Sequence, residues 1–296
     1  MNAPVATLLG DGSRLHLQHG PIDLVIGADV ASQRDRRCAF EAAANRFDTV
    51  LSELVGELPL LRRATGGEGP SGAIARRMDR AVRPFAAQVF VTPMAAVAGA
   101  VADEVLSATV ASAPMSRAYV NNGGDIALHL GEAAQYGAAI AGLDGADHGR
   151  ITIDAATPVR GIATSGQGGR SLSFGIATSV TVLARNGAAA DVAATLIANA
   201  VDLPGHPSIT RMRASDIAPD SDLGARRVVT SVGPLSADDV ETALAAGATT
   251  AHAMFERGLV LGAALFLRGS RRIVGPVSQN PVSQNLIEQT QMVENA

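Results

Sequence analysis

The chain has 296 residues, 47% hydrophobic, 18% charged and 3% aromatic with no Trp, so it can bury a sizeable core built mostly of Ala, Val, Leu and Ile. The formal net charge of −4 gives no electrostatic reason to expect a nucleic-acid partner, and a single Cys excludes an internal disulfide framework. No apolar run approaches the roughly 18 residues of a membrane span. Residues 1–10 lack a basic start and a long apolar region, so we expect no signal peptide, no membrane partner and a cytoplasmic protein.

The first elements are expected to be a hairpin and two helices. Residues 13–27 alternate apolar and polar residues around a Gly-Pro turn, which is typical of two paired strands. Apolar residues recur at helical spacing over 35–58. A glycine-rich connection at 65–72, which has no Lys and is unlike a P-loop, leads to a short basic helix at 73–82.

The middle of the chain is expected to alternate strands and helices. A strand is expected at 88–91, then an Ala- and Gly-rich helix from Pro93 to about residue 110. Asn-Gly between apolar runs predicts a hairpin over 117–130. Further strands are expected at 136–141, 150–153, 159–164 and 180–183, and a helix at 188–201.

The last part is expected to hold a polar loop at 204–222, a strand at 226–231, two separate helices at 236–244 and 249–257, and a hairpin over 259–274. The sum is a single α+β domain over 1–275, with mainly antiparallel sheets and helices packed on them. The polar C-terminal tail, 276–296, carries Pro-Val-Ser-Gln-Asn twice and is either loose or docked on a partner chain. A homo-oligomer is therefore an open alternative.

One turn combines hairpin chemistry with a carboxylate. In Asn122-Gly123-Gly124-Asp125, Asn and Gly tolerate the positive φ of a tight turn, and bare glycine lets another molecule approach the backbone N–H groups. Asp125 follows where it could accept a hydrogen bond or meet a cation. The alternative is an ordinary hairpin with a solvated Asp.

A second polar segment follows a strand. Residues 164–170 gather the hydroxyls of Thr164 and Ser165, the backbone of Gly166 and an Arg, a combination that suits phosphate or pyrophosphate. The segment does not fit G-x-G-x-x-G, so it gives no support to a Rossmann domain. The alternative is a flexible loop.

Two oxygens share one face of an expected helix. Asp191 and Thr195 are four residues apart near its start, and a carboxylate with a hydroxyl can hold a hard cation. Two ligands do not complete the octahedron of Mg²⁺, so phosphates, carbonyls and water must supply the rest. The alternative is a helix-start Asp and a Thr that bonds back to a carbonyl.

Four segments resemble, in the same order, the motifs of the ApbE-type FAD:protein FMN transferases. They are 95–103, 122–126, 161–166 and 190–195, and the resemblance covers about a third of the chain. The chain looks like an uncharacterised, shorter branch of that family. The resemblance implies a T-fold-like α+β arrangement with FAD or another nucleotide between the sheet ends and the helices, and Mg²⁺ beside it. It implies that Asn122, Gly123, Gly124, Asp125, Thr164, Ser165 and Gly166 contact the nucleotide, and that Asp191 and Thr195 contact the metal.

The chain also departs from the family's pattern. The transferases place His-Ile-x-Asp-Pro after Ala-Thr-Ser-Gly, whereas here the connection is only 167–173, without His, Asp or Pro. Two expected flavin contacts fall on Ala98 and Thr92. Two functions follow as alternatives, with no catalytic residue assigned: a Mg²⁺-dependent transferase or hydrolase acting on a flavin nucleotide, or a non-catalytic flavin- or nucleotide-binding or scaffold protein whose transferase site has decayed.

Overall fold

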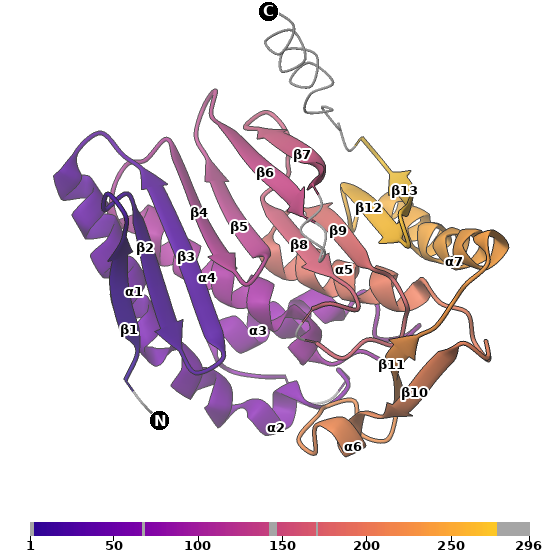
Figure 1. Ribbon diagram of the computed structural model, residues 1–296. Helices are drawn as coiled ribbons and strands as arrows, with labels where there is room; N and C mark the ends of the chain where they lie inside the picture. Colours follow the sequence, from indigo (N-terminus) through magenta and orange to yellow (C-terminus); the bar gives the residue numbers. More distant parts are fainter. Residues whose placement is uncertain (1–2, 67–68, 142–146, 170, 277–296) are drawn as a thin grey trace, which may run out of the picture.

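In the computed structural model, which describes residues 3–66, 69–141, 147–169 and 171–276, helices pack on one face of a large antiparallel sheet (Figure 1). The sheet has nine strands in the order β1-β2-β3-β4-β5-β8-β9-β12-β13, and every neighbouring pair is antiparallel. Its strands are β1 (Val5–Leu9), β2 (Arg14–His19), β3 (Ile22–Asp29), β4 (Arg117–Asn122), β5 (Asp125–Leu130), β8 (Gly161–Ser165), β9 (Ser179–Ala184), β12 (Gly262–Leu267) and β13 (Ser270–Val274). The expected α+β class is confirmed, while residues 277–296 of the expected tail lie outside the described residues.

The helices bury their apolar faces against this sheet and against one another. They are α1 (Gln33–Gly56), α2 (Leu58–Leu61), α3 (Ala73–Val82), η1 (Pro93–Ala96), α4 (Val97–Ser112), α5 (Gly187–Ala200), α6 (Ala214–Ile217) and α7 (Ala237–Glu256). Side chains cap three of them: Ser32 begins α1, Asn186 begins α5, and Ser236 forms a capping box with Asp239 at α7. These caps fix where the helices start relative to the sheet ends.

Two small sheets complete the fold. β6 (Gln135–Ala141) pairs with β7 (Asp147–Asp154), and Ile151 and Ile153 of β7 pack on the sheet face opposite the helices. β10 (Ile209–Arg213) pairs with β11 (Arg227–Val232). The large sheet therefore has a helix side, which holds the main core, and a strand side, where a smaller core lies under β6 and β7.

Helices α4 and α5 cross at a glycine pair. A Cβ placed on Gly99 would lie 2.2 Å from the carbonyl oxygen of Gly187, a distance that a real side chain cannot occupy. The segment Pro93–Ser112, which includes α4, is long and apolar enough to cross a membrane by length and composition alone, contrary to the expectation from the sequence. In this structure α4 contacts α1, α3, α5 and the strands β4 and β5.

Three expected elements are wrong. Residues 88–91 form turns and coil instead of a strand. The expected loop at 204–222 contains β10 and α6. Helix α7 runs without a break, because Gly247 marks a close contact and not a helix end: a Cβ there would lie 2.3 Å from Cγ2 of Val201.

Candidate functional site

A cavity of about 570 Å³ opens between the helices and the ends of strands β4, β5 and β8. We call it the helix-side cavity. Eight of the nine residues expected from the sequence line it: Asn122, Gly123, Asp125, Thr164, Ser165, Gly166, Asp191 and Thr195. The ninth, Gly124, lines a second cavity on the strand side of the sheet. The structure thus brings together segments that are up to 73 residues apart in the chain.

The β4–β5 turn presents its backbone to the helix-side cavity. Asn122 pairs with Asp125 across the turn, and Gly123 and Gly124 have φ values of 64° and 114°, which favour glycine. The Gly124 N–H donates to Oδ1 of Asn121 at 2.8 Å. Asn122 donates from Nδ2 to the Ala98 carbonyl at 3.1 Å, which links the turn to the start of α4. The turn is therefore held from both sides in a fixed position.

The end of β8 forms the adjoining wall. Gly166 has φ of 154°, and a Cβ there would lie 2.5 Å from the Thr178 carbonyl oxygen, so only glycine fits. The Thr164 N–H donates to the Asp125 carboxylate, which ties the two strand ends together. Arg170, the cation expected at the end of this segment, lies outside the described residues.

Asp191 has a structural partner that the sequence did not reveal. Its Oδ2 accepts a hydrogen bond from the backbone N–H of Gly99 at 3.0 Å, and the N–H of Ala98 also bonds to this carboxylate. Both N–H groups belong to the first turn of α4, where they have no partner within the helix. Asp191 thus caps the neighbouring helix α4, while in its own helix it lies beyond the first turn.

Two carboxylates in this cavity carry raised pKa values. Loss of solvation raises the pKa of Asp125 from 3.8 to about 7, against the opposing effect of the Thr164 N–H. Loss of solvation raises the pKa of Asp191 well above 3.8, and the negative charge of Asp125 raises it further. No ion pair joins either carboxylate to an Arg or His among the residues that the structure describes.

The opposite wall of the helix-side cavity is apolar. Sequence reasoning missed it, because these positions were assigned only to helix packing. Its main contributors are Leu51, Leu54, Val55, Leu58, Met94 and Val101, with Arg62 at its edge. Helices α1 and α2 supply four of these six apolar residues, so the cavity has one apolar side and one side of glycine backbone, hydroxyls and carboxylates.

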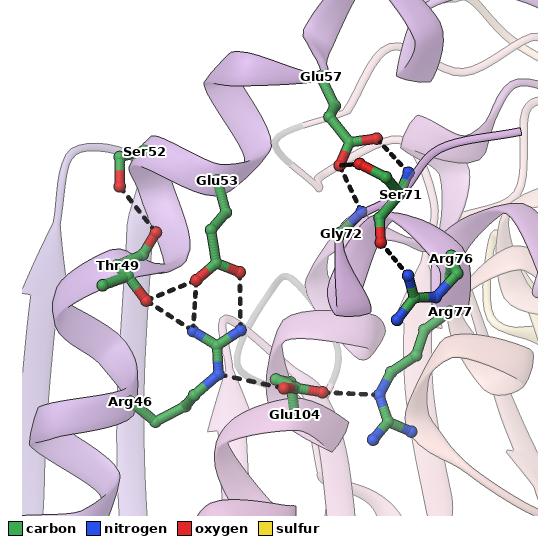
Figure 2. Close-up of polar contacts among 10 residues, drawn as sticks. All are labelled: Arg46, Thr49, Ser52, Glu53, Glu57, Ser71, Gly72, Arg76, Arg77 and Glu104. Carbon is green, nitrogen blue, oxygen red and sulfur yellow. Dashed lines mark hydrogen bonds and ion pairs between the residues drawn. The ribbon is translucent and has the colours of Figure 1, made fainter.

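A charged network fixes the helices behind this wall (Figure 2). Glu104 of α4 accepts from Nε of Arg46 in α1 at 3.1 Å and from Nε of Arg77 in α3 at 2.9 Å. Burial alone would raise the pKa of Glu104, but these two hydrogen bonds hold it below its usual value. Glu57, just after α1, accepts from the backbone N–H of Ser71 at 2.8 Å. The contacts of Glu104 therefore join α1, α3 and α4.

The donors for a metal are few and come from oxygen. No group of three or more His, Cys, Asp or Glu side chains suited to a metal occurs within the described part of the chain. The cavity offers the carboxylates of Asp125 and Asp191 and the hydroxyl of Thr195. Hard oxygen donors of this kind suit Mg²⁺ when a ligand phosphate and water complete the shell. Asp125, for which the sequence left a hydrogen bond or a cation open, lines the same cavity as Asp191 and Thr195.

Comparisons with known proteins place the chain in a family. A family model described as "AbpE bacteria" matches residues 6–273. Among curated relatives, a UPF0280 protein of Methanopyrus kandleri is 36% identical over 150 residues, which is 50% of this chain and 56% of the relative. Another UPF0280 protein, from Methanothrix thermoacetophila, is 40% identical over 129 residues, which is 43% of this chain and 52% of the relative. The chain thus spans about half the length of these relatives.

Solved structures that match this chain include the ApbE protein of Thermotoga maritima, with 12% identity and a TM-score of 0.42 over 88% of this chain and 96% of that one. They also include the flavin transferase ApbE of Vibrio cholerae, with 13% identity and a TM-score of 0.43 over 91% and 97%. Because the family model covers most of the described residues, this chain belongs to the ApbE-like family.

Proposed function

We propose that the helix-side cavity binds a flavin or a related nucleotide together with Mg²⁺. The observation that carries the proposal is the Asp125–Asp191 pair, two carboxylates enclosed in one cavity without a neutralising cation among the described residues. A pair of this kind is costly when both groups are ionised, and a divalent cation offsets that cost. A cation-dependent ligand site accounts for why the pair stands in a cavity and not on the surface.

The two sides of the cavity match the two ends of a nucleotide. The apolar wall at the end of α1 suits a flat ring, which gains most of its binding energy from buried apolar surface. The glycine backbone around Gly123 and Gly166 can approach phosphate oxygens closely. Mg²⁺ would be held by Asp125, Asp191 and Thr195 and would neutralise the phosphates beside them. When bound, the metal would supply Lewis-acid polarisation of a phosphate.

Binding calorimetry tests the proposal. FMN and FAD are titrated into the purified protein with and without Mg²⁺, and so is Mg²⁺ alone. We expect negligible binding of Mg²⁺ alone and a gain in nucleotide affinity on adding it of about 5- to 150-fold. The variant Asp125→Asn keeps an oxygen to accept from Thr164 but loses the charge, so it should lose most of the Mg²⁺ gain. If neither flavin binds the parent protein with Mg²⁺ present, the proposed function is wrong.

The resemblance to transferases extends the proposal to a divergent flavin-handling enzyme, and one observation favours the non-catalytic alternative. The titratable residues lining the helix-side cavity, within the described ranges, are Arg62, Asp125 and Asp191, with no His. The missing His favours a binder, whereas the pKa of Asp125, about 7, lies where a general base is most effective and favours an enzyme. Turnover of FAD to FMN and AMP, measured by chromatography, separates the two: product formation supports an enzyme, and intact FAD supports a binder.

Two further proposals come from the sequence and the family. We infer that the arrangement of sheet and helices is T-fold-like. We also propose a cytoplasmic location and leave self-association open; cell fractionation and light scattering of the purified protein test these two points.

A further inference from the structure

A third cavity lies between α3, the start of α5 and the residues around 84–85 and 259. Its volume is about 320 Å³, at the lower end of the range for small-molecule sites. We call it the Arg80 cavity. Among the described residues, it shares no lining residue with the helix-side cavity or with the cavity on the strand side of the sheet. It is therefore a separate place on the molecule.

Arg80 of α3 lines this cavity and has no partner. It makes no hydrogen bond or ion pair with any residue that the structure describes. Other Arg residues of the same helix are paired: Arg76 donates to the Ser71 carbonyl. Arg83 donates to Asp79 at 2.7 Å. A guanidinium carries five N–H donors in a fork that matches a carboxylate or a phosphate, so Arg80 keeps its full donor set for a ligand.

Arg77 adds a second guanidinium to the same lining. Its Nε donates to Glu104 at 2.9 Å, while Nη1 and Nη2 make no hydrogen bond to a residue in the described ranges (Figure 2). Arg77 and Arg80 are three residues apart in α3, so their side chains are neighbours on one face of the helix. The cavity is thus lined by two adjacent guanidinium groups that have unused donors.

Asp103 is the one acid in the described lining, and the start of α5 occupies its oxygens. Oδ1 accepts from the N–H of Gly187 at 2.8 Å, and Oδ2 accepts from the N–H of Ala188 at 2.9 Å. The N–H of Ala189 donates to Oδ1 of Asn186 at 2.8 Å. These N–H groups are already paired, so an anion in the cavity would be held by the Arg side chains. Two positive charges against one negative charge leave the lining net positive.

The rest of the lining is mostly apolar. Phe85 is 4% exposed, and Ala81, Pro84 and Leu259 lie beside it in the cavity wall. An inorganic anion would leave this surface uncovered, whereas a ligand with an apolar body gains free energy by covering it. Guanidinium groups beside an apolar surface therefore suit a molecule with an anionic head and an apolar body.

We propose that the Arg80 cavity binds a small organic anion, with a carboxylate or phosphate head held by Arg77 and Arg80 and an apolar body packed against Phe85 and Leu259. The two guanidinium groups offset the charge of the head, so this site needs no divalent cation. It goes beyond the proposed function, which concerns the helix-side cavity, and does not depend on it.

Two variants and a control test this site in the purified chain without Mg²⁺. Arg80→Gln removes the unpaired guanidinium, and Ala189→Leu fills the cavity from α5 while keeping both Arg residues. Arg76→Gln removes an exposed Arg from the same helix that does not line the cavity, and serves as the matched control. Ligand-observed NMR measures dissociation constants for phenyl phosphate, benzoate, inorganic phosphate and benzyl alcohol.

We expect the parent to bind phenyl phosphate, benzoate or both with a dissociation constant of about 1 mM or lower, and the comparison of the two identifies the preferred head. Inorganic phosphate should bind at least about tenfold more weakly, and benzyl alcohol should not bind. Arg80→Gln and Ala189→Leu should each weaken the organic anion about tenfold or more, and Arg76→Gln less than about twofold. The melting temperature of Arg80→Gln should equal that of the parent, because Arg80 has no partner to lose.

The inference is wrong if neither organic anion binds the parent, or if benzyl alcohol binds as tightly as they do. It is also wrong if Arg76→Gln weakens the anion as much as Arg80→Gln does, since the basic helix would then attract anions without a site. If Ala189→Leu does not fold, the comparison of Arg80→Gln with Arg76→Gln decides. These outcomes leave the proposed function untouched, and a failure to bind flavin would leave this site untouched, because the two cavities share no described lining residue.

Discussion

Asp191 of α5 accepts a hydrogen bond from the backbone N–H of Gly99 in α4, at 3.0 Å and across 92 residues of sequence. The reverse contact also exists: Asp103 of α4 accepts from the N–H groups of Gly187 and Ala188 at the start of α5, at 2.8 and 2.9 Å. Each helix therefore caps the other with a carboxylate. The glycine crossing between them lets the two helix starts approach closely enough for this exchange.

Asp191 caps α4 and is also proposed to bind the cation, and two substitutions separate these two roles. Asp191→Ala leaves the Gly99 and Ala98 N–H groups without their acceptor, so it should lower the stability by about 1–3 kcal/mol. Asp191→Asn keeps an oxygen acceptor and should lose less, while removing the charge that a cation needs. Thermal unfolding and calorimetry are compared for the two variants.

In both variants the gain in nucleotide affinity on adding Mg²⁺ should disappear. A result in which Asp191→Asn keeps the full Mg²⁺ effect would make Asp191 a purely structural cap. Asp103→Asn is the matched control, because it weakens the reciprocal cap at α5 without touching the lining of the helix-side cavity.

The turn glycines give a second prediction. Gly124 has φ of 114° and nothing within 4 Å of a Cβ built on it, so Gly124→Val strains the backbone without a clash inside the protein. Gly12, with φ of 77° and equally open surroundings, lies in the β1–β2 turn and lines neither cavity. Both valine variants should lose about 1–3 kcal/mol of stability, but only Gly124→Val should lose nucleotide binding. Equal nucleotide affinity in the two variants would remove the turn from the site.

Much of the fold could be predicted from the sequence, because most elements carry strong local patterns. The hairpin over 117–130 followed from Asn-Gly between apolar runs, and α3 was expected as a short basic helix at 73–82. Elements whose pattern is set by tertiary contacts were missed. β10 is short and mostly exposed, so it lacks alternation. Two helices were expected at 236–244 and 249–257, whereas α7 is continuous and Gly247 in the expected gap marks close packing.

The candidate site also has some parts that could be predicted from the sequence and others that could not. Motifs of glycine, hydroxyl and carboxylate could be found because each is local in sequence, and the structure assembles eight of their nine residues around one cavity. The apolar wall could not be found, since Leu54 and Val101 look like any core residue. The capping role of Asp191 could not be predicted from the sequence either, because its partner Gly99 is 92 residues away. Such a pairing depends on how α4 and α5 cross.

Transfer chemistry gives a third prediction. The connection between Ser165 and the next strand has no His, Asp or Pro over 167–173, and no His lines the described part of the helix-side cavity. We therefore expect no transfer of FMN to a Thr-containing acceptor at rates typical of the transferases. The measurement is in-gel flavin fluorescence of an added acceptor with FAD and Mg²⁺. Efficient, Mg²⁺-dependent labelling would overturn this and make the chain a transferase with an altered base.

The raised pKa of Asp125 predicts how stability depends on pH. Because its pKa is about 7 in the folded protein and 3.8 ordinarily, the folded state holds a proton that the unfolded state has lost between these values. The stabilising contribution is thus complete below about pH 4 and is lost as pH rises through 7.

Without metal, the melting temperature of the parent should fall from pH 5 to 8 relative to that of Asp125→Asn, which cannot titrate there. With nucleotide and Mg²⁺, the gain in melting temperature should grow over the same range, because the cation replaces the proton. Parallel pH profiles for the parent and Asp125→Asn would show that this carboxylate titrates normally and would remove the electrostatic basis for a cation beside it.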